Sequence, residues 1–256
     1  MTRPGIGLQM YTLREQTAQD FEGTLRQVAA MGYEGVEFAG YGDIPAEQMK
    51  ALLEELGLIA IGNHVPLVNL ETKIDEEIAY LTTIGAKYAI CPWLPVDVRD
   101  AEAWKKHIVN FAEYGKRFQE AGIIFCYHNH EFEFEVEIDG QVVFDKLYET
   151  VSADLLQVEM DLGWVQYAGR DTLEYISKYA GRLPLVHLKD FVKNTAKAEI
   201  DTVELGRGDL DLLPLIQRSE ESDVKWLIVE QDRCANPPLE SVEESINWLK
   251  TNYLNK

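Results

Sequence analysis

The stretch QEAGIIFCYHNH, residues 119–130, contains the pattern that decides the fold. A polar, helix-like segment ends at Gly122, and an apolar run then leads directly to His128 and His130. A glycine in this position is typical of the left-handed residue that ends a helix, and a continuous apolar run is typical of a strand buried on both faces. The stretch therefore predicts a helix followed by a buried parallel strand, whose carboxyl end carries polar side chains.

The same pattern occurs three more times, at AAMGYEGVEF, EELGLIAIGNH and TTIGAKYAICPW. The glycines that end the helical segments, Gly32, Gly57, Gly85 and Gly122, are 25, 28 and 37 residues apart. Each interval has room for one strand and one helix. Continuous apolar strands that alternate with helices indicate βαβ units in a parallel sheet.

The whole chain can be divided in this way. The predicted strands are IGLQMY, GVEF, IAIGNH, YAICPW, IIFCYH, LLQVEMDL, LPLVHLKD and WLIVEQD. The predicted helices are Phe21–Met31, Ala46–Leu56, Asp75–Ile84, Glu102–Gln119, Phe144–Ser152, Thr172–Ala180, Asp211–Glu220 and Leu239–Asn252. Their strict alternation predicts an α/β protein, a single (β/α)8 TIM barrel over residues 1–256. A doubly wound open sheet would normally carry a glycine-rich turn after its first strand, and LQMYTLREQ has none.

A small β-hairpin is expected as an insertion after the fifth strand. The stretch EFEFEVEIDGQVVF, residues 131–144, alternates with a period of two around Asp139-Gly140, which is a strong hairpin signal. One face of this hairpin would carry Phe132, Phe134, Val136 and Ile138. The other face, expected to meet solvent, would carry Glu133, Glu135 and Glu137.

Composition and charge narrow the class of protein. The 256 residues are 46% hydrophobic and 27% charged, as in a soluble globular enzyme. A formal net charge of −20, from 44 acidic and 24 basic residues, repels phosphate backbones and anionic surfaces, so neither nucleic acid nor a membrane is an expected partner. The three cysteines form no CxxC motif and the N-terminus has no signal sequence, which predicts a cytoplasmic protein. Trp248 and Tyr253 in the last helix are compatible with a homo-oligomer as well as with packing on the barrel.

Polar side chains end the predicted strands, which is where the active sites of such barrels lie. Four of the five histidines fall at these ends, and only His107 lies on a helix. A single histidine is more often structural, but four on one rim beside acidic residues indicate a functional site. The side chains at strand ends include Gln9, Tyr11, Glu37, His64, Trp93, His128, His130, Glu159, Asp161, His187, Lys189, Glu230 and Asp232.

A metal site is predicted on one side of the barrel mouth. His128, Asp161, His187 and Glu230 each end an apolar run, one on each of strands five to eight. Imidazole and carboxylate ligands together suit one divalent ion such as Mn, Co or Zn, and a carboxylate-rich set also admits Mg. Glu159 lies two residues before Asp161 and shares its orientation, so it can be a metal ligand or a residue that holds a metal ligand in place.

The motifs together resemble the xylose-isomerase-like TIM-barrel superfamily, in particular its sugar phosphate isomerase/epimerase group. The resemblance covers essentially the whole chain and is carried by GLQMYTLR, GYEGVEFAG, GNHVP, YHNHEFEF, MDLGW, HLKD and IVEQD. It implies a divalent metal held by His128, Asp161, His187 and Glu230. Many sugar epimerases of this superfamily have a glutamate where this chain has His128, and paired glutamates exchange protons on opposite faces of the sugar. The histidine therefore brings the dehydratases and keto-sugar lyases of the superfamily into consideration.

The resemblance implies a sugar or sugar-derivative isomerase or epimerase, which abstracts a proton next to a carbonyl through a metal-stabilised enediolate. A metal-dependent dehydratase or lyase acting on a keto-sugar or keto-inositol is the alternative. A non-catalytic sugar-binding barrel is a more remote one, as is a metal-dependent endonuclease, which would need more histidines and a basic surface. In each enzyme reading, the partner is a small sugar or polyol.

Roles can be assigned to the remaining polar residues at the barrel mouth. The expected catalytic residues are Glu230 as ligand and base, His130 or His64 as acid or base, Glu37 as base or hydroxyl ligand, and Lys189 as an oxyanion donor. The expected substrate-binding residues are Gln9, the aromatic walls Tyr11, Trp93 and Trp164, and Arg207. Arg207 lies in the GRGD turn and would meet an anionic substituent.

Overall fold

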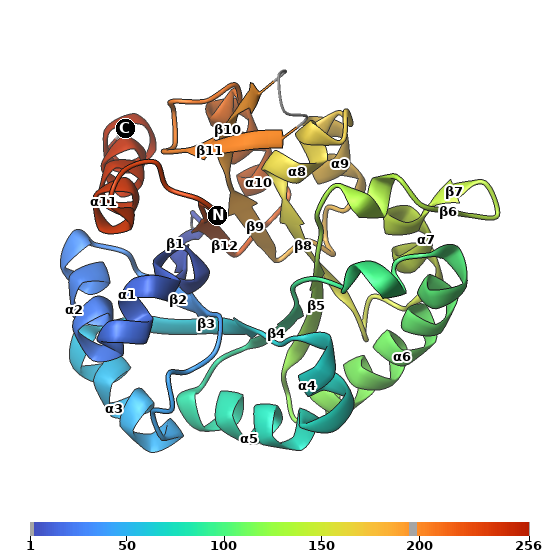
Figure 1. The fold of residues 1–256 in the computed structure, drawn as a ribbon, viewed down its shortest axis with the longest axis horizontal. Helices are drawn as coiled ribbons and strands as arrows, with labels where there is room; N and C mark the ends of the chain where they lie inside the picture. Colours follow the sequence, from blue (N-terminus) through green and yellow to red (C-terminus); the bar gives the residue numbers. More distant parts are fainter. Residues whose placement is uncertain (1–2, 195–198, 256) are drawn as a thin grey trace.

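The computed structural model describes residues 3–194 and 199–255, and its parallel strands close into a barrel. The order around the barrel is β1-β12-β9-β8-β5-β4-β3-β2, so strands that follow one another along the chain are neighbours. Figure 1 shows the helices placed around the outside of these strands. The predicted (β/α)8 TIM barrel is confirmed.

The elements have the following bounds. The barrel strands are β1 (Gly5–Gln9), β2 (Gly35–Phe38), β3 (Ile59–His64), β4 (Tyr88–Cys91), β5 (Ile124–His128), β8 (Gln157–Asp161), β9 (Leu185–Leu188) and β12 (Trp226–Val229). Two hairpins are added, β6 (Glu137–Ile138) with β7 (Gln141–Val142) and β10 (Asp190–Asn194) with β11 (Glu199–Val203). The α-helices are α1 (Arg14–Gln19), α2 (Phe21–Met31), α3 (Ala46–Leu56), α4 (Leu67–Thr72), α5 (Ile74–Ile84), α6 (Ala101–Glu120), α7 (Val143–Thr150), α8 (Leu162–Tyr167), α9 (Thr172–Lys178), α10 (Leu212–Glu221) and α11 (Pro238–Leu249). Short helical turns are η1 (Met10–Leu13), η2 (Val96–Val98), η3 (Phe132–Phe134) and η4 (Lys250–Leu254).

The recurring glycines end helices, as the sequence predicts. Gly32, Gly57, Gly85 and Gly122 have φ angles of 93°, 67°, 73° and 76°, in the left-handed region that a side chain disfavours. The amide of Gly57 donates to Leu53 and Glu54 at the end of α3, which satisfies carbonyls that the helix leaves free. This local signal explains why the predicted helices α2 and α3 have the bounds that the structure shows.

Two apolar layers support the barrel mouth. The larger core lies between strands and helices, and Trp248 and Tyr253 pack against it. A second cluster contains Ile61, Tyr88, Ile90, Cys126, Leu185 and Ile228, all from barrel strands. Burying each of the aliphatic side chains contributes about 1.5–3 kcal/mol. The interior of the barrel is therefore filled by side chains, as expected for a barrel of eight strands.

The expected hairpin after β5 is shorter than the alternating pattern predicts. Residues 132–134 form the turn η3, and only β6 and β7 pair, with Asp139 and Gly140 in the left-handed conformation that suits a tight turn. The expected solvent face is wrong for Glu133, which is fully buried. Its carboxyl group accepts hydrogen bonds from the Tyr127 hydroxyl (2.5 Å) and from the His130 amide (2.8 Å).

The second hairpin, β10–β11, is held at the end of β9 by one carboxylate. Asp190 accepts hydrogen bonds from the amides of Phe191, Gly206, Gly208 and Leu210, at 2.9–3.2 Å. It immediately follows Lys189, so the hairpin and the turn after it are fixed close to the polar strand end. Within the described residues, no helix is long and apolar enough to span a lipid bilayer.

Candidate active site

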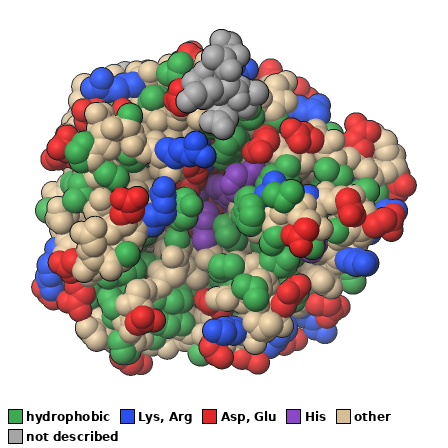
Figure 2. Space-filling model, viewed as in Figure 1, with side chains coloured by type: hydrophobic (Ala, Val, Ile, Leu, Met, Phe, Trp, Pro, Cys, Tyr) green, Lys and Arg blue, Asp and Glu red, His purple; other side chains and the backbone are tan. Residues whose placement is uncertain are grey.

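A cavity of about 620 Å³ opens at the carboxyl ends of the strands. It is lined by Tyr11, Arg14, Ala39, His64, Pro66, Pro92, Trp93, His128, His130, Glu230, Asp232 and Arg233. Figure 2 shows histidine side chains in a hollow in the middle of this face, with basic and hydrophobic side chains around it. The polar residues predicted at several strand ends therefore meet in one concave site.

An inner layer of the site contains two buried carboxylates, from Glu37 and Glu159, and His64. The Oε2 atom of Glu159 lies 2.9 Å from His64 Nε2, 3.0 Å from His128 Nδ1 and 3.4 Å from His187 Nε2. The Oε2 atom of Glu37 lies 3.0 Å from His64 Nε2 and 2.8 Å from His187 Nε2. The three imidazoles are therefore fixed in orientation by carboxylates beneath the cavity.

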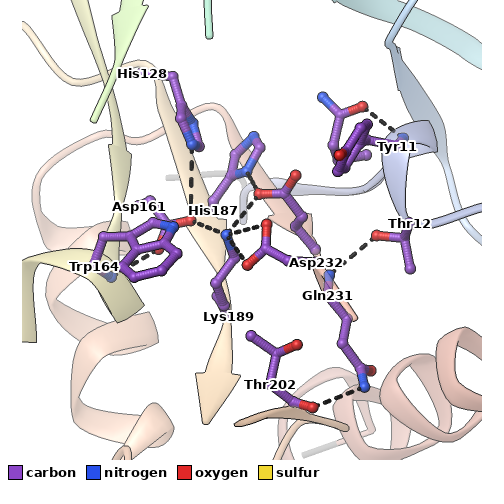
Figure 3. Close-up of polar contacts among 12 residues, drawn as sticks. Tyr11, Thr12, His128, Asp161, Trp164, His187, Lys189, Thr202, Gln231 and Asp232 are labelled. Atoms are coloured by element: carbon purple, nitrogen blue, oxygen red, sulfur yellow. Dashed lines mark hydrogen bonds and ion pairs between the residues drawn. The ribbon is translucent and has the colours of Figure 1, made fainter. Parts of the chain in front are cut away.

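An outer layer contains three carboxylates around one lysine. Lys189 Nζ lies 2.8 Å from Asp161, 3.0 Å from Glu230 and 2.9 Å from Asp232. Figure 3 shows Lys189 with dashed contacts to Asp161 and Asp232. Lys189, Asp161 and Glu230 are almost inaccessible to solvent, whereas the Asp232 side chain is 26% exposed. Three negative charges meet one positive charge here, which leaves a formal charge of −2.

Two histidines connect the layers, each through its two ring nitrogens. His187 faces the inner layer with Nε2 and places Nδ1 2.9 Å from Glu230 Oε2. His128 faces the inner layer with Nδ1 and places Nε2 3.9 Å from Asp161 Oδ2. Both are buried, at 0% and 2% exposure. These two bridging histidines are thus held from one side while their other nitrogens face the outer carboxylates.

Two overlapping groups of side chains can hold a metal ion, and both contain the bridging histidines. One adds His64 and Glu159 of the inner layer, and the other adds Asp161 and Glu230 of the outer layer. In each group the ligand atoms lie within 4.8 Å of one another. The Oε1 atoms of Glu37 and Glu159 are buried and have no hydrogen-bond partner within the described residues. The donor set of imidazole and carboxylate fits a divalent transition metal or, with fewer nitrogens, Mg.

The local electrostatics set the charge states. Burial lowers the pKa of His64, but Glu37 and Glu159 outweigh this effect and raise it to about 9. Burial raises the pKa of Glu230, but Lys189 and His187 hold it well below its usual range. His64 is therefore charged at neutral pH, and Glu230 is ionised.

His130 differs from the other histidines of the site. Burial, and then Lys189, lower its pKa to about 3, so it is neutral. Its ring stacks on Phe132 at 5.7 Å and lies 5.5 Å from the Trp164 ring, and its Nδ1 atom has no partner within the described part of the chain. Glu133 holds its backbone amide from below. Sequence reasoning missed this role of Glu133, because the alternating pattern places the residue with its exposed neighbours.

Several predicted site residues do not line the main cavity. Gln9 is buried and donates to Glu37 at 2.6 Å, so both belong beneath the cavity floor. Trp164 lines an adjoining cavity of about 220 Å³, which shares Asp232 and Arg233 with the main one. Arg207 is exposed, pairs with Glu244 at 2.8 Å and lines neither of these cavities.

Two arginines that line the cavity, Arg14 and Arg233, were not predicted from the sequence. Arg14 falls in the stretch GLQMYTLR, but its position on the rim depends on the turn η1, which the apolar pattern does not reveal. Asp232 is more central than its sequence context suggests, because both of its oxygens contact Lys189.

The chain is similar in sequence to known enzymes and similar in fold to solved structures. The inosose dehydratase of Clostridium perfringens is 24% identical over 268 residues, covering 90% of this chain and 89% of the relative. The inosose dehydratase of Geobacillus kaustophilus is 25% identical, covering 82% of this chain and 79% of the relative. The crystal structure of a sugar phosphate isomerase/epimerase from Parabacteroides distasonis has a TM-score of 0.84 at 23% identity and covers 99% of this chain and 100% of its own.

A family model described as xylose isomerase-like TIM barrel matches residues 25–252. The match includes seven of the eight barrel strands and all of the histidines at the site. It agrees with the closed barrel and with the polar cluster at the strand ends. The chain therefore belongs to the xylose isomerase-like TIM barrel family.

Proposed function

We propose that the protein is a metal-dependent carbon–oxygen lyase that removes water from a cyclic keto-polyol or keto-sugar. The observation that carries this proposal is the one-sided placement of the carboxylates that line the cavity. Glu230 and Asp232 both follow β12, whereas His64 ends β3 and His130 follows β5, across the barrel. A carboxylate facing a histidine across a ring suits removal of a proton on one side and donation of a proton on the other.

The residues proposed to hold the metal are His128, Asp161, His187 and Glu230. Carboxylates of the inner layer contact the far nitrogens of both histidines, which is the usual support of a metal-ligating imidazole. The outer layer keeps a formal charge of −2 after Lys189 is counted, which a divalent ion would balance. Such an ion, when bound, would polarise a substrate carbonyl as a Lewis acid.

Asp232 is the proposed base. Its side chain is partly exposed to the cavity, and burial raises its pKa although Lys189 lowers it. It would take the proton from the carbon next to the substrate carbonyl, and the electrons of that C–H bond would form the new C=C bond. Lys189 would compensate the charge of its neighbours throughout.

His64 is the proposed acid. It lines the cavity opposite Asp232, and its contacts with Glu37 and Glu159 favour the charged form. It would give a proton to the hydroxyl on the next carbon, so that the C–O bond breaks and water leaves. Neutral His130, which also lines the cavity, would form a hydrogen bond to a substrate hydroxyl.

A second candidate is an isomerase or epimerase acting on a sugar, and one observation favours it. The placement of the cavity carboxylates, Glu230 and Asp232, on one side also suits transfer of a proton between neighbouring carbons on the same face. The relatives named inosose dehydratase support the lyase, and the fold shared with a sugar phosphate isomerase/epimerase is compatible with either activity.

A panel of keto-inositols and keto-sugars in deuterated water, with Mn²⁺ and after treatment with a chelator, tests the proposal. A lyase forms an unsaturated ketone that absorbs ultraviolet light, whereas an isomerase incorporates deuterium without loss of water. Asp232→Asn should lower the rate at least about 100-fold, in line with general-base catalysis. Glu135→Gln, an exposed site outside the cavity, is the matched control. Absence of both exchange and product with every ketone would contradict the proposal.

A further inference from the structure

Two aromatic side chains stand out at the mouth of the cavity. Among the large hydrophobic side chains exposed in the described residues, Tyr11 (43% exposed) and Trp93 (44%) are the aromatic ones. Both line the same cavity, although one follows β1 and the other follows β4. Exposed aromatic rings gathered at one opening indicate a surface that binds a ligand.

Each of these rings is held in place by an arginine. The Arg14 guanidinium lies 4.4 Å from the centre of the Tyr11 ring and donates to the Tyr11 carbonyl at 2.9 Å. The Arg99 guanidinium lies 4.7 Å from the centre of the Trp93 ring, and it donates to the Leu94 carbonyl at 2.7 Å. Cation–π contacts of this kind restrain the rings, so less conformational entropy is lost when a ligand binds.

The cavity has a polar floor and an aromatic mouth. The floor carries the carboxylates and histidines of the proposed reaction, whereas Tyr11, Trp93 and the two cavity arginines surround the opening. A volume of about 620 Å³ lies within the range of roughly 300–1,000 Å³ that is typical of pockets for drug-sized ligands, and such ligands are larger than one sugar ring. A ligand that reacts at the floor therefore has room for a second group at the mouth.

We propose that this second group is a sugar ring, so that the preferred substrate is a glycoside whose second ring lies on Tyr11 and Trp93. The choice of a reacting keto-sugar at the floor rests on the proposed function. The C–H face of a sugar ring complements the negative face of an aromatic ring, which disfavours a phosphate at the same place. The hydroxyls of the second ring accept hydrogen bonds from Arg14, which forms no ion pair with a carboxylate within the described residues.

Titration calorimetry on the metal-loaded protein tests this subsite without any turnover. The probes are glucose, glucose 6-phosphate, cellobiose and maltose. At least one disaccharide should bind about five- to tenfold more tightly than glucose, as expected for stacking on aromatic rings. Trp93→Ala and Tyr11→Ala should reduce this ratio to about one, and Trp93→Phe should restore most of it. Val109→Ala, which removes an exposed side chain from α6, is the control.

Equal affinity for glucose and both disaccharides would overturn the subsite, as would tighter binding of glucose 6-phosphate or an unchanged ratio in Trp93→Ala. The outcome is independent of catalysis. A disaccharide preference that depends on Trp93, in a protein that converts no ketone, would support the subsite and contradict the proposed lyase.

Discussion

Replacing Asp161 by Asn and, separately, His64 by Gln distinguishes the two groups of side chains that can hold a metal. Asp161 belongs only to the outer group, and His64 belongs only to the inner group. His128 and His187 are common to both, so variants of those residues would weaken either site. The pair of substitutions therefore reports directly on where the ion binds.

The expected magnitudes follow from the contacts. Residues that support a ligand typically contribute 10–100-fold to metal affinity, and loss of a charged ligand should cost more. Asp161→Asn should therefore raise the Kd for Mn²⁺ more than about 100-fold, equivalent to about 2.7 kcal/mol or more. His64 contacts Glu37 and Glu159 rather than the outer carboxylates, so His64→Gln should change the Kd by about tenfold or less.

The assay is titration of the chelator-treated protein with Mn²⁺, followed by elemental analysis after dialysis. Thermal unfolding of the metal-free variants controls for misfolding, because Asp161→Asn also removes a partner of the buried Lys189. Binding that survives in Asp161→Asn and disappears in His64→Gln would refute the outer assignment and place the ion among His64, His128, Glu159 and His187.

Three further predictions concern stability. Burial raises the pKa of Glu133 from 4.5 to about 8, so its contribution to stability is complete below about pH 4.5 and is lost as the pH rises to about 8. Urea unfolding measures this effect: between pH 6 and pH 9, the free energy of unfolding of the wild type should fall by about 2–3 kcal/mol relative to that of Glu133→Gln. Asp190→Ala leaves four backbone amides without their acceptor and should lower the free energy of unfolding by about 3 kcal/mol, measured by the same method; a loss below about 1 kcal/mol would show that the loop re-forms its hydrogen bonds. Mn²⁺ at 100 times its Kd should stabilise the protein by about 2.7 kcal/mol, seen as a higher Tm that a chelator reverses and that Asp161→Asn lacks.

The barrel could be predicted from local patterns because each strand–helix unit has its own sequence signal. Gly32 and Gly57 end helices at positions that the structure confirms, since a left-handed residue is a local requirement. The clustering of His128, Asp161, His187 and Glu230 could also be predicted, because parallel strands bring their carboxyl ends to one rim. The barrel topology alone is therefore enough to predict that these four side chains lie close together.

The remaining features depend on contacts that no local pattern contains. Glu133 alternates with exposed glutamates, yet the turn η3 rotates it inward to Tyr127. The division into an inner and an outer layer depends on which ring nitrogen of His187 faces which carboxylate, and this is a property of tertiary packing. Arg14 reaches the rim only because η1 turns the chain across the barrel mouth.

The placement of Glu230 and Asp232 after the same strand has a stereochemical consequence. The hydrogen on the carbon next to a ketone can project from either face of a ring, and in the proposed reaction only one of these faces would meet a base. Of two substrates that differ only in the configuration at this carbon, only one should then lose water. In the proposed reaction, the configuration of the substrate that reacts is decided by the order in which the strands follow one another around the barrel.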